Sequence, residues 1–296
     1  MKTLQQAWAL ALPLVLTGGC IVSVDSQAQM AREEKRFAVS GTPVVRLTTF
    51  DGSIEIKSWD RPEVLVEIEK RGPTREAIES LEVKSSQDGS TIEVDVQRPG
   101  GQRIIGIGLG SSASARLIVS VPRKADIRAR SGDGAIQIAR VDGRLELHTG
   151  DGSIRASELS GELSLTTGDG SITVDGAEGR LELQTGDGGV NVTGNLGVVR
   201  LHTGDGAIVY RSERGSAMAG DWEITTGDGA VSLYLPPDFG AELDAHTGDG
   251  SIGNDLAVTS ADSPGEDRRS VKGRLGSGGK RLRIRTGDGS IRLRSL

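Results

Sequence analysis

The chain has 296 residues, of which 26% are charged and only 3% aromatic, and its formal net charge is -6 at pH 7. This acidic balance argues against broad nucleic-acid binding, which needs a basic surface, and a thick globular core normally contains more aromatic bulk. The only cysteine, Cys20, excludes an intramolecular disulfide framework. With 43 glycines, the composition favours an elongated array of short strands and tight corners.

The first 20 residues have the pattern of an export signal. Lys2 precedes an apolar run at residues 7–16, which is too short to cross a bilayer as a helix. The following LTGGC resembles the bacterial lipoprotein signal, in which the cysteine, here Cys20, is lipidated, although Thr17 stands where that pattern has Leu. The alternative is an ordinary signal peptide cleaved after Ala28, which would discard the cysteine. Both interpretations predict export.

A polar tether is expected at residues 21–36, and strand patterning begins at Phe37. The fold is expected to start irregularly, because the terminal units of repeat proteins are often atypical. In chain order, the predicted elements are a strand–corner–strand unit around Asp51, alternating apolar residues at 64–68, a short helix at 75–81, and strands at 91–96 and 116–121. Between the last two, the apolar and glycine-rich residues 104–109 are expected to form a mobile or strand-forming segment.

The centre of the chain repeats one unit of 18 residues, as in RLELHTGDGSI and ELSLTTGDGSI. Five corner aspartates have this spacing: Asp133, Asp151, Asp169, Asp187 and Asp205. Mostly apolar residues lie six and four positions before each aspartate, and a branched aliphatic residue lies three after it. This period of two predicts strands with one buried face, joined by a Gly-Asp-Gly corner and by a second glycine-rich corner. Glycine is expected at both corners because it can adopt a positive φ. Ile154, Ile172, Val190 and Ile208 are expected to form one buried column.

The repeat predicts an all-β fold, namely a single-stack parallel β-solenoid with coils of about 18 residues. Equivalent residues would then stack at the ~4.8 Å spacing of strands. An antiparallel β meander, with Gly-Asp-Gly as a hairpin loop, is the alternative. Near-identity of the corners favours the solenoid, because only there do equivalent residues touch one another.

Towards the C-terminus the repeats continue with looser spacing, around Asp228, Asp249 and Asp288. Residues 254–279 are predicted to be a long surface loop, and the last copy is expected to close the array.

The predicted division of the chain is a signal peptide at 1–20, a tether at 21–36 and a β-solenoid domain at 37–296. The solenoid domain is divided further into an irregular entrance at 37–128, regular repeats at 129–210 and looser repeats at 211–296.

The column of corner aspartates suggests a cation site, since calcium prefers carboxylate oxygens. One carboxylate in 18 residues supplies too few ligands, so we expect Asp133, Asp151, Asp169, Asp187 and Asp205 to be structural, with at most weak cation binding. In this interpretation each aspartate accepts hydrogen bonds from the backbone amides of its corner.

The sequence predicts no catalytic residues, no metal site and no cofactor, and therefore no enzyme. His148 and His202 are three copies apart, about 14 Å in a stack, which is too far to share a zinc ion. These residues and His246 are expected on an outer face. The recurrent threonine two positions before each aspartate is in phase with the buried residues, and no base accompanies it. A polysaccharide-cleaving β-helix protein is the enzymatic alternative.

The last copy is basic, and its arginines alternate with apolar residues at Arg281, Arg283, Arg285, Arg292 and Arg294. We expect all five to share the outer face, where arginine forks could bind anionic envelope groups. The alternative is that they only prevent a terminal coil from pairing with another chain.

Several stretches together resemble a bacterial adhesin-like family of β-strand-repeat proteins with a domain of unknown function. They are LTTFDGSIEI, ARLIVSVPRKADIRARSGDGAIQI, the serial TGDGSI units and GRLGSGGKRLRIRTGDGSIRL, and the likeness spans residues 37–296. The resemblance implies no catalytic residues. It favours a non-enzymatic structural or adhesion protein of the cell envelope, in the periplasm or at the outer membrane. The expected partners are the membrane, through a lipid anchor, and an envelope glycan, glycolipid or protein, but no nucleic acid. A polysaccharide-binding protein is the alternative.

Overall fold

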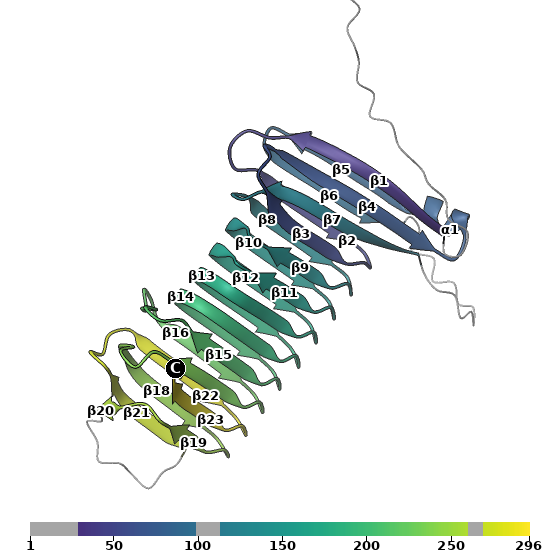
Figure 1. The fold of residues 1–296 in the computed structure, drawn as a ribbon. Coiled ribbons are helices and arrows are strands. Elements are labelled where there is room, and N and C mark those ends of the chain that lie inside the picture. Colours follow the sequence, from purple (N-terminus) through teal and green to yellow (C-terminus); the bar gives the residue numbers. More distant parts are fainter. Residues whose placement is uncertain (1–28, 99–112, 260–268) are drawn as a thin grey trace, which may run out of the picture.

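The computed structural model describes residues 29–98, 113–259 and 269–296. The signal segment with Cys20 and the apolar residues 104–109 lie outside these ranges. All the described strands belong to one mixed sheet, which winds into an elongated stack (Figure 1). The prediction of an all-β fold is confirmed.

The regular repeats form two ladders of parallel strands on either side of a common core (Figure 1). The first ladder contains β8 (Asp126–Ser131), β10 (Asp142–Thr149), β12 (Ser160–Thr167) and the C-terminal parts of β13 (Ile172–Thr185) and β14 (Val190–Thr203). The second contains β9 (Ile136–Ala139), β11 (Ile154–Ser157), the N-terminal parts of β13 and β14, and β15 (Ile208–Ser212). We call one first-ladder strand, its Gly-Asp-Gly corner and the following second-ladder strand a coil.

The predicted 18-residue register is present in both ladders. Ile154 pairs with Ile172, Ile172 with Val190, and Val190 with Ile208, and no side chain of this column is more than 2% exposed. Leu145 and Leu163 are paired in the same way in the first ladder. These pairings are parallel, so the antiparallel meander is wrong for the repeats.

At the Gly-Asp-Gly corner, glycine is required because a side chain would clash with the preceding coil, not because φ is positive. A Cβ on Gly188 would lie 2.0 Å from the carbonyl oxygen of Gly170 in the preceding coil. None of the Gly-Asp-Gly residues has a positive φ, so that part of the prediction is wrong for this corner. It holds at the second corner, where Gly161 and Gly176 have φ of 117° and 67°.

At the N-terminal end, the first coil lies one layer inside the stack. It consists of β2 (Val44–Thr49) and β3 (Ile54–Trp59), which pair with β8 and β9 on one side and with β6 (Thr91–Gln97) and β7 (Ser114–Pro122) on the other. Antiparallel strands complete this end: β1 (Gln29–Ala38), β4 (Glu63–Gly72) and β5 (Glu82–Asp88). The predicted helix is α1 (Arg75–Glu79), capped by Thr74.

The C-terminal end has the same arrangement. The last coil consists of β22 (Arg281–Thr286) and β23 (Ile291–Ser295). On one side it pairs with the coil of β16 (Trp222–Thr226) and β17 (Val231–Leu235). On the other side it pairs with the coil of β18 (Ala241–Thr247) and β19 (Ile252–Asn254). Outside them, β20 (Val258–Thr259) pairs antiparallel with β21 (Ser270–Leu275), which pairs antiparallel with β18.

Three predictions about the ends are therefore wrong. Residues 29–36 are not a tether, because they belong to β1, which pairs with β4. The described part of the predicted loop at 254–279 contains β20 and β21, and residues 260–268 lie outside the described ranges. The last copy does not close the array, because β18 and β19 cover it.

Candidate functional site

We call the exposed side of the first ladder the first face. Ion pairs on this face connect neighbouring coils. Arg128 Nε lies 2.6 Å from Glu146 Oε2, and Arg285 Nη2 lies 2.5 Å from Asp244 Oδ2. The hydrogen bond from Arg128 holds the pKa of Glu146 below its ordinary value, against the opposing effect of burial. For Asp244, burial raises the pKa, but the hydrogen bond and charge of Arg285 outweigh it and leave the pKa lowered.

The basic last coil lies between two acidic coils on this face. Glu223 of β16 is paired in register with Arg283, which is paired with Asp244 of β18. Arg283 Nη1 lies 3.9 Å from Glu223 Oε1, and the backbone amide of Arg281 donates to Asp221 Oδ1 at 3.0 Å. Opposite charges on directly opposed strand residues stabilise a sheet. Charge complementarity therefore supports the position of the last coil inside the stack.

The five arginines predicted as one patch are divided between two faces. Arg281, Arg283 and Arg285 belong to β22 in the first ladder, whereas Arg292 and Arg294 belong to β23 in the second. The prediction that they share one outer face is wrong, because the Gly-Asp-Gly corner between the two strands turns the chain to the other side of the core. Neither strand is at an edge, so the edge-protection alternative fails as well.

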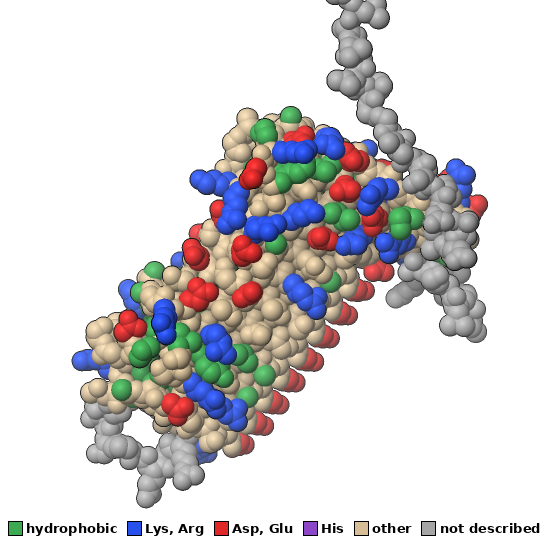
Figure 2. Space-filling view, in the orientation of Figure 1, with side chains coloured by type: hydrophobic (Ala, Val, Ile, Leu, Met, Phe, Trp, Pro, Cys, Tyr) green, Lys and Arg blue, Asp and Glu red, His purple; other side chains and the backbone are tan. Residues whose placement is uncertain are grey.

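The exposed side of the second ladder, the second face, brings together residues that the sequence analysis did not combine. Arg211 of β15, Tyr234 of β17 and Arg294 of β23 are paired across three successive coils, and Arg292 is exposed two residues before Arg294. The guanidinium carbon of Arg211 lies 4.2 Å from the centroid of the Tyr234 ring. We call these four residues the arginine–tyrosine patch. Figure 2 shows basic and hydrophobic side chains gathered near the C-terminal end of one face.

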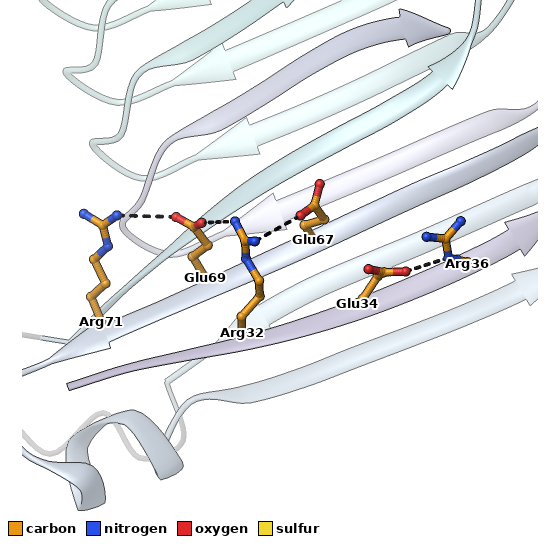
Figure 3. Close-up of polar contacts among 6 residues, drawn as sticks. All are labelled: Arg32, Glu34, Arg36, Glu67, Glu69 and Arg71. Carbon is orange, nitrogen blue, oxygen red and sulfur yellow. Dashed lines mark hydrogen bonds and ion pairs between the residues drawn. The ribbon is translucent and has the colours of Figure 1, made fainter. Parts of the chain in front are cut away.

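Within the described residues, none of the three arginines of this patch has a carboxylate within ion-pair distance. The antiparallel strands at the N-terminal end contrast with them (Figure 3). There Arg32 lies 2.5 Å from the buried Glu69 and 3.6 Å from Glu67, and Arg71 lies 3.4 Å from Glu69. The unpaired guanidinium groups of the patch keep their donors available to a ligand.

The predicted aspartate column is present, but not with its predicted bonding. Asp133, Asp151, Asp169, Asp187 and Asp205 are exposed at successive corners. Figure 2 shows a row of acidic side chains along one edge of the stack. No hydrogen bond within the described residues joins these carboxylates to the corner amides. The corner is instead held by threonine: Thr203 Oγ1 donates to the Gly186 carbonyl at 2.9 Å and accepts from the Gly206 amide at 3.2 Å.

His148, His202 and His246 are exposed on the first face, in register with other polar residues. Among the described residues, no three histidine, cysteine, aspartate or glutamate side chains are grouped closely enough to hold a metal ion. In the same ranges, no helix has the length and apolar character needed to cross a bilayer.

The fold and these faces define an all-β protein of stacked, mostly parallel coils with antiparallel strands at both ends. The chain belongs to the family described as Toastrack DUF4097, whose match covers residues 39–294. No curated protein matches the chain in sequence.

Solved structures of several bacterial proteins align with this chain over most of its length. One, from Clostridium sporogenes, is provisionally described as a cell adhesion protein; it is 12% identical, with 91% of this chain and 100% of that one covered and a TM-score of 0.32. Two are from Parabacteroides distasonis, and each has a TM-score of 0.42. One is provisionally described as an adhesin, with 9% identity and 91% and 99% coverage. The other is provisionally described as a lipid binding protein, with 11% identity and 88% and 96% coverage.

Proposed function

We propose that the chain is a non-enzymatic structural or adhesion protein of the cell envelope, and that its coils form a β-solenoid whose faces are the contact surfaces. The observation that carries this proposal is the pair of in-register ladders. They continue from β6 and β7 at one end to β18 and β19 at the other. Continuous ladders present long, regular faces, which suit extended or repeated partners.

The proposed partners are an envelope glycan, glycolipid or protein. The test uses the purified folded chain and isolated envelope fragments from bacteria. We expect saturable retention of the protein on the fragments, without release of new reducing sugar ends. Release of reducing ends would support the alternative, a polysaccharide-cleaving β-helix protein. Failure of every envelope fraction to retain the protein would contradict the adhesive function.

We also propose that the protein is exported and held at a membrane by a lipid on Cys20. Lipid chains supply the binding free energy of such anchors, and stable attachment commonly needs more than one acyl chain. Changing Cys20→Ser should therefore move the protein from the membrane fraction to the soluble fraction, as measured by immunoblotting after fractionation. Mass spectrometry of the mature N-terminus is the control, because a chain that starts at Gln29 would contradict the lipid anchor.

A further inference from the structure

The arginine–tyrosine patch has the chemistry of a binding site for a polymer with spaced negative charges. We propose that Arg211, Arg292 and Arg294 bind an acidic polysaccharide, and that Tyr234 positions Arg211. This proposal rests on the proposed envelope function and names the chemical class of the partner.

The stacking of Arg211 on Tyr234 prepares that arginine for a ligand. The two residues are directly paired on adjacent strands, and the guanidinium carbon is 4.2 Å from the ring centroid. A guanidinium group that stacks on an aromatic ring retains its in-plane N–H donors, which match the geometry of a carboxylate. Because the ring restricts the side chain before binding, less conformational entropy is lost when a carboxylate arrives.

The spacing of the three arginines favours a polymer over a single small anion. Arg211 and Arg294 are two coils apart, about 10 Å between their backbones, and Arg292 and Arg294 are about 7 Å apart along β23. A small anion with a single carboxylate could contact only one of these arginines at a time. An extended chain with repeated carboxylates could contact all three at once, and linked contacts strengthen one another.

Other polyanions fit the patch less well. Nucleic acids carry dense phosphate charge and are bound through a broad basic footprint, whereas this patch has only three arginines. Binding to anionic lipid surfaces commonly uses clusters of four to eight basic residues, and the patch has three arginines. A polysaccharide with one carboxylate per sugar carries less charge per unit length than duplex DNA. The ring of Tyr234 adds a half-buried aromatic contact among the arginines.

The chain contains a matched control on the first face. Arg46, Arg130 and Arg200 are also exposed, and no ion pair joins them to a carboxylate within the described residues. The patch variant R211Q/R292Q/R294Q and the control variant R46Q/R130Q/R200Q change the net charge by the same amount. Any difference between them therefore reports the place of the charges rather than their number.

The probes are polygalacturonate, neutral dextran, single-stranded DNA and phosphatidylglycerol vesicles, tested against the folded protein at several salt concentrations. We expect the wild-type protein to bind polygalacturonate in preference to the other three. The patch variant should bind it at least about tenfold more weakly, with a flatter salt dependence, and the control variant should stay close to wild type. Equal losses in both variants, no binding of polygalacturonate, or preference for DNA or vesicles would overturn the proposed site.

The role of Tyr234 is tested with Tyr234→Phe and Tyr234→Ala. Phenylalanine keeps the stacking ring, so Y234F should bind polygalacturonate like wild type, whereas Y234A should bind several-fold more weakly. Thermal unfolding of both variants checks that the coils remain folded. Full affinity in Y234A would remove the tyrosine from the site. If the wild-type protein does not bind polygalacturonate but is still retained on envelope fragments, another chemistry makes the adhesive contact, and only the present inference fails.

Discussion

At the scale of single residues, the repeat is organised around the buried threonine that precedes each Gly-Asp-Gly. Thr149, Thr167, Thr185 and Thr203 are at most 3% exposed, and each hydroxyl donates to glycine carbonyls of the preceding coil. The sequence located these residues correctly, because their phase matches that of the buried leucines. It did not show that threonine, rather than aspartate, holds the corner, because both residue types can cap backbone groups in turns.

Thr185→Val should destabilise the protein while preserving its shape. The hydroxyl of Thr185 lies 2.9 Å from the carbonyl oxygen of Gly170 and 3.2 Å from that of Gly168. Loss of this hydrogen bonding should lower the free energy of unfolding by about 1–2 kcal/mol, as measured by urea denaturation. The control is Thr173→Val, at an exposed position of β13, which should change stability by less than about 0.5 kcal/mol. Equal losses would show that the buried hydroxyl has no special role.

The ion pair between Arg285 and Asp244 should make the C-terminal end sensitive to acid. The pKa of Asp244 is lowered in the folded protein, so its contribution to stability is present above the unfolded pKa of an aspartate. That contribution is lost as the pH falls through the lower, folded value. We expect hydrogen exchange in residues 241–254 to accelerate as the pH falls through this range, after correction for intrinsic exchange. Asp244→Asn should reduce this acceleration, and an unchanged pH profile in that variant would contradict the assignment.

At the scale of elements, close packing of coils explains why glycine recurs at the corner. Gly188 and Gly189 provide a test within one corner. A Cβ on Gly188 would lie 2.0 Å from the Gly170 carbonyl oxygen, whereas the nearest atom to a Cβ on Gly189 is 3.9 Å away. Gly188→Ala should therefore cost roughly 1–3 kcal/mol or more, because the two coils must separate. Gly189→Ala should be close to neutral by the same denaturation measurement, and a similar cost for both would mean that coil spacing does not select glycine.

The strands themselves could be predicted well from the sequence, because 18-residue identity forces equivalent residues into register. The buried column from Ile154 to Ile208 follows directly from that spacing. The antiparallel strand β1 could not be found in this way. Its sequence, QMAREEKRFA, is highly charged, and its strand conformation depends on pairing with β4, far away in the sequence.

The arginine–tyrosine patch was missed for a related reason. Its residues come from three coils, and Arg211 and Tyr234 had no repeat position that distinguished them. The position of β23 between β17 and β19 brings Arg294 next to Tyr234, and this order differs from the order of the chain. One signal was available, namely that Arg285 and Arg292 flank a Gly-Asp-Gly corner and so must belong to different strands.

At the scale of the whole molecule, the first and the last coil each lie one layer inside the stack. Equivalent positions in different coils are nearly interchangeable, so hydrophobic periodicity does not determine the order of the coils at the ends. Charge does distinguish them at the C-terminal end. The acidic residues Asp221 and Glu223 precede the basic last coil, and Glu242 and Asp244 belong to the coil that covers it.

Deletion of residues 280–296 should therefore leave an end that cannot close properly. Without β22, direct docking of β18 on β16 would place Asp244 opposite Glu223, and like charges on directly opposed strand residues destabilise a sheet. We expect fast hydrogen exchange in residues 222–259 and concentration-dependent association in sedimentation, because the strand edges of β16 and β17 are left open. The same deletion combined with Asp221→Arg and Glu223→Arg should restore protection and a monomeric state. A deletion chain that is already protected and monomeric without these changes would show that charge complementarity does not fix the place of the last coil.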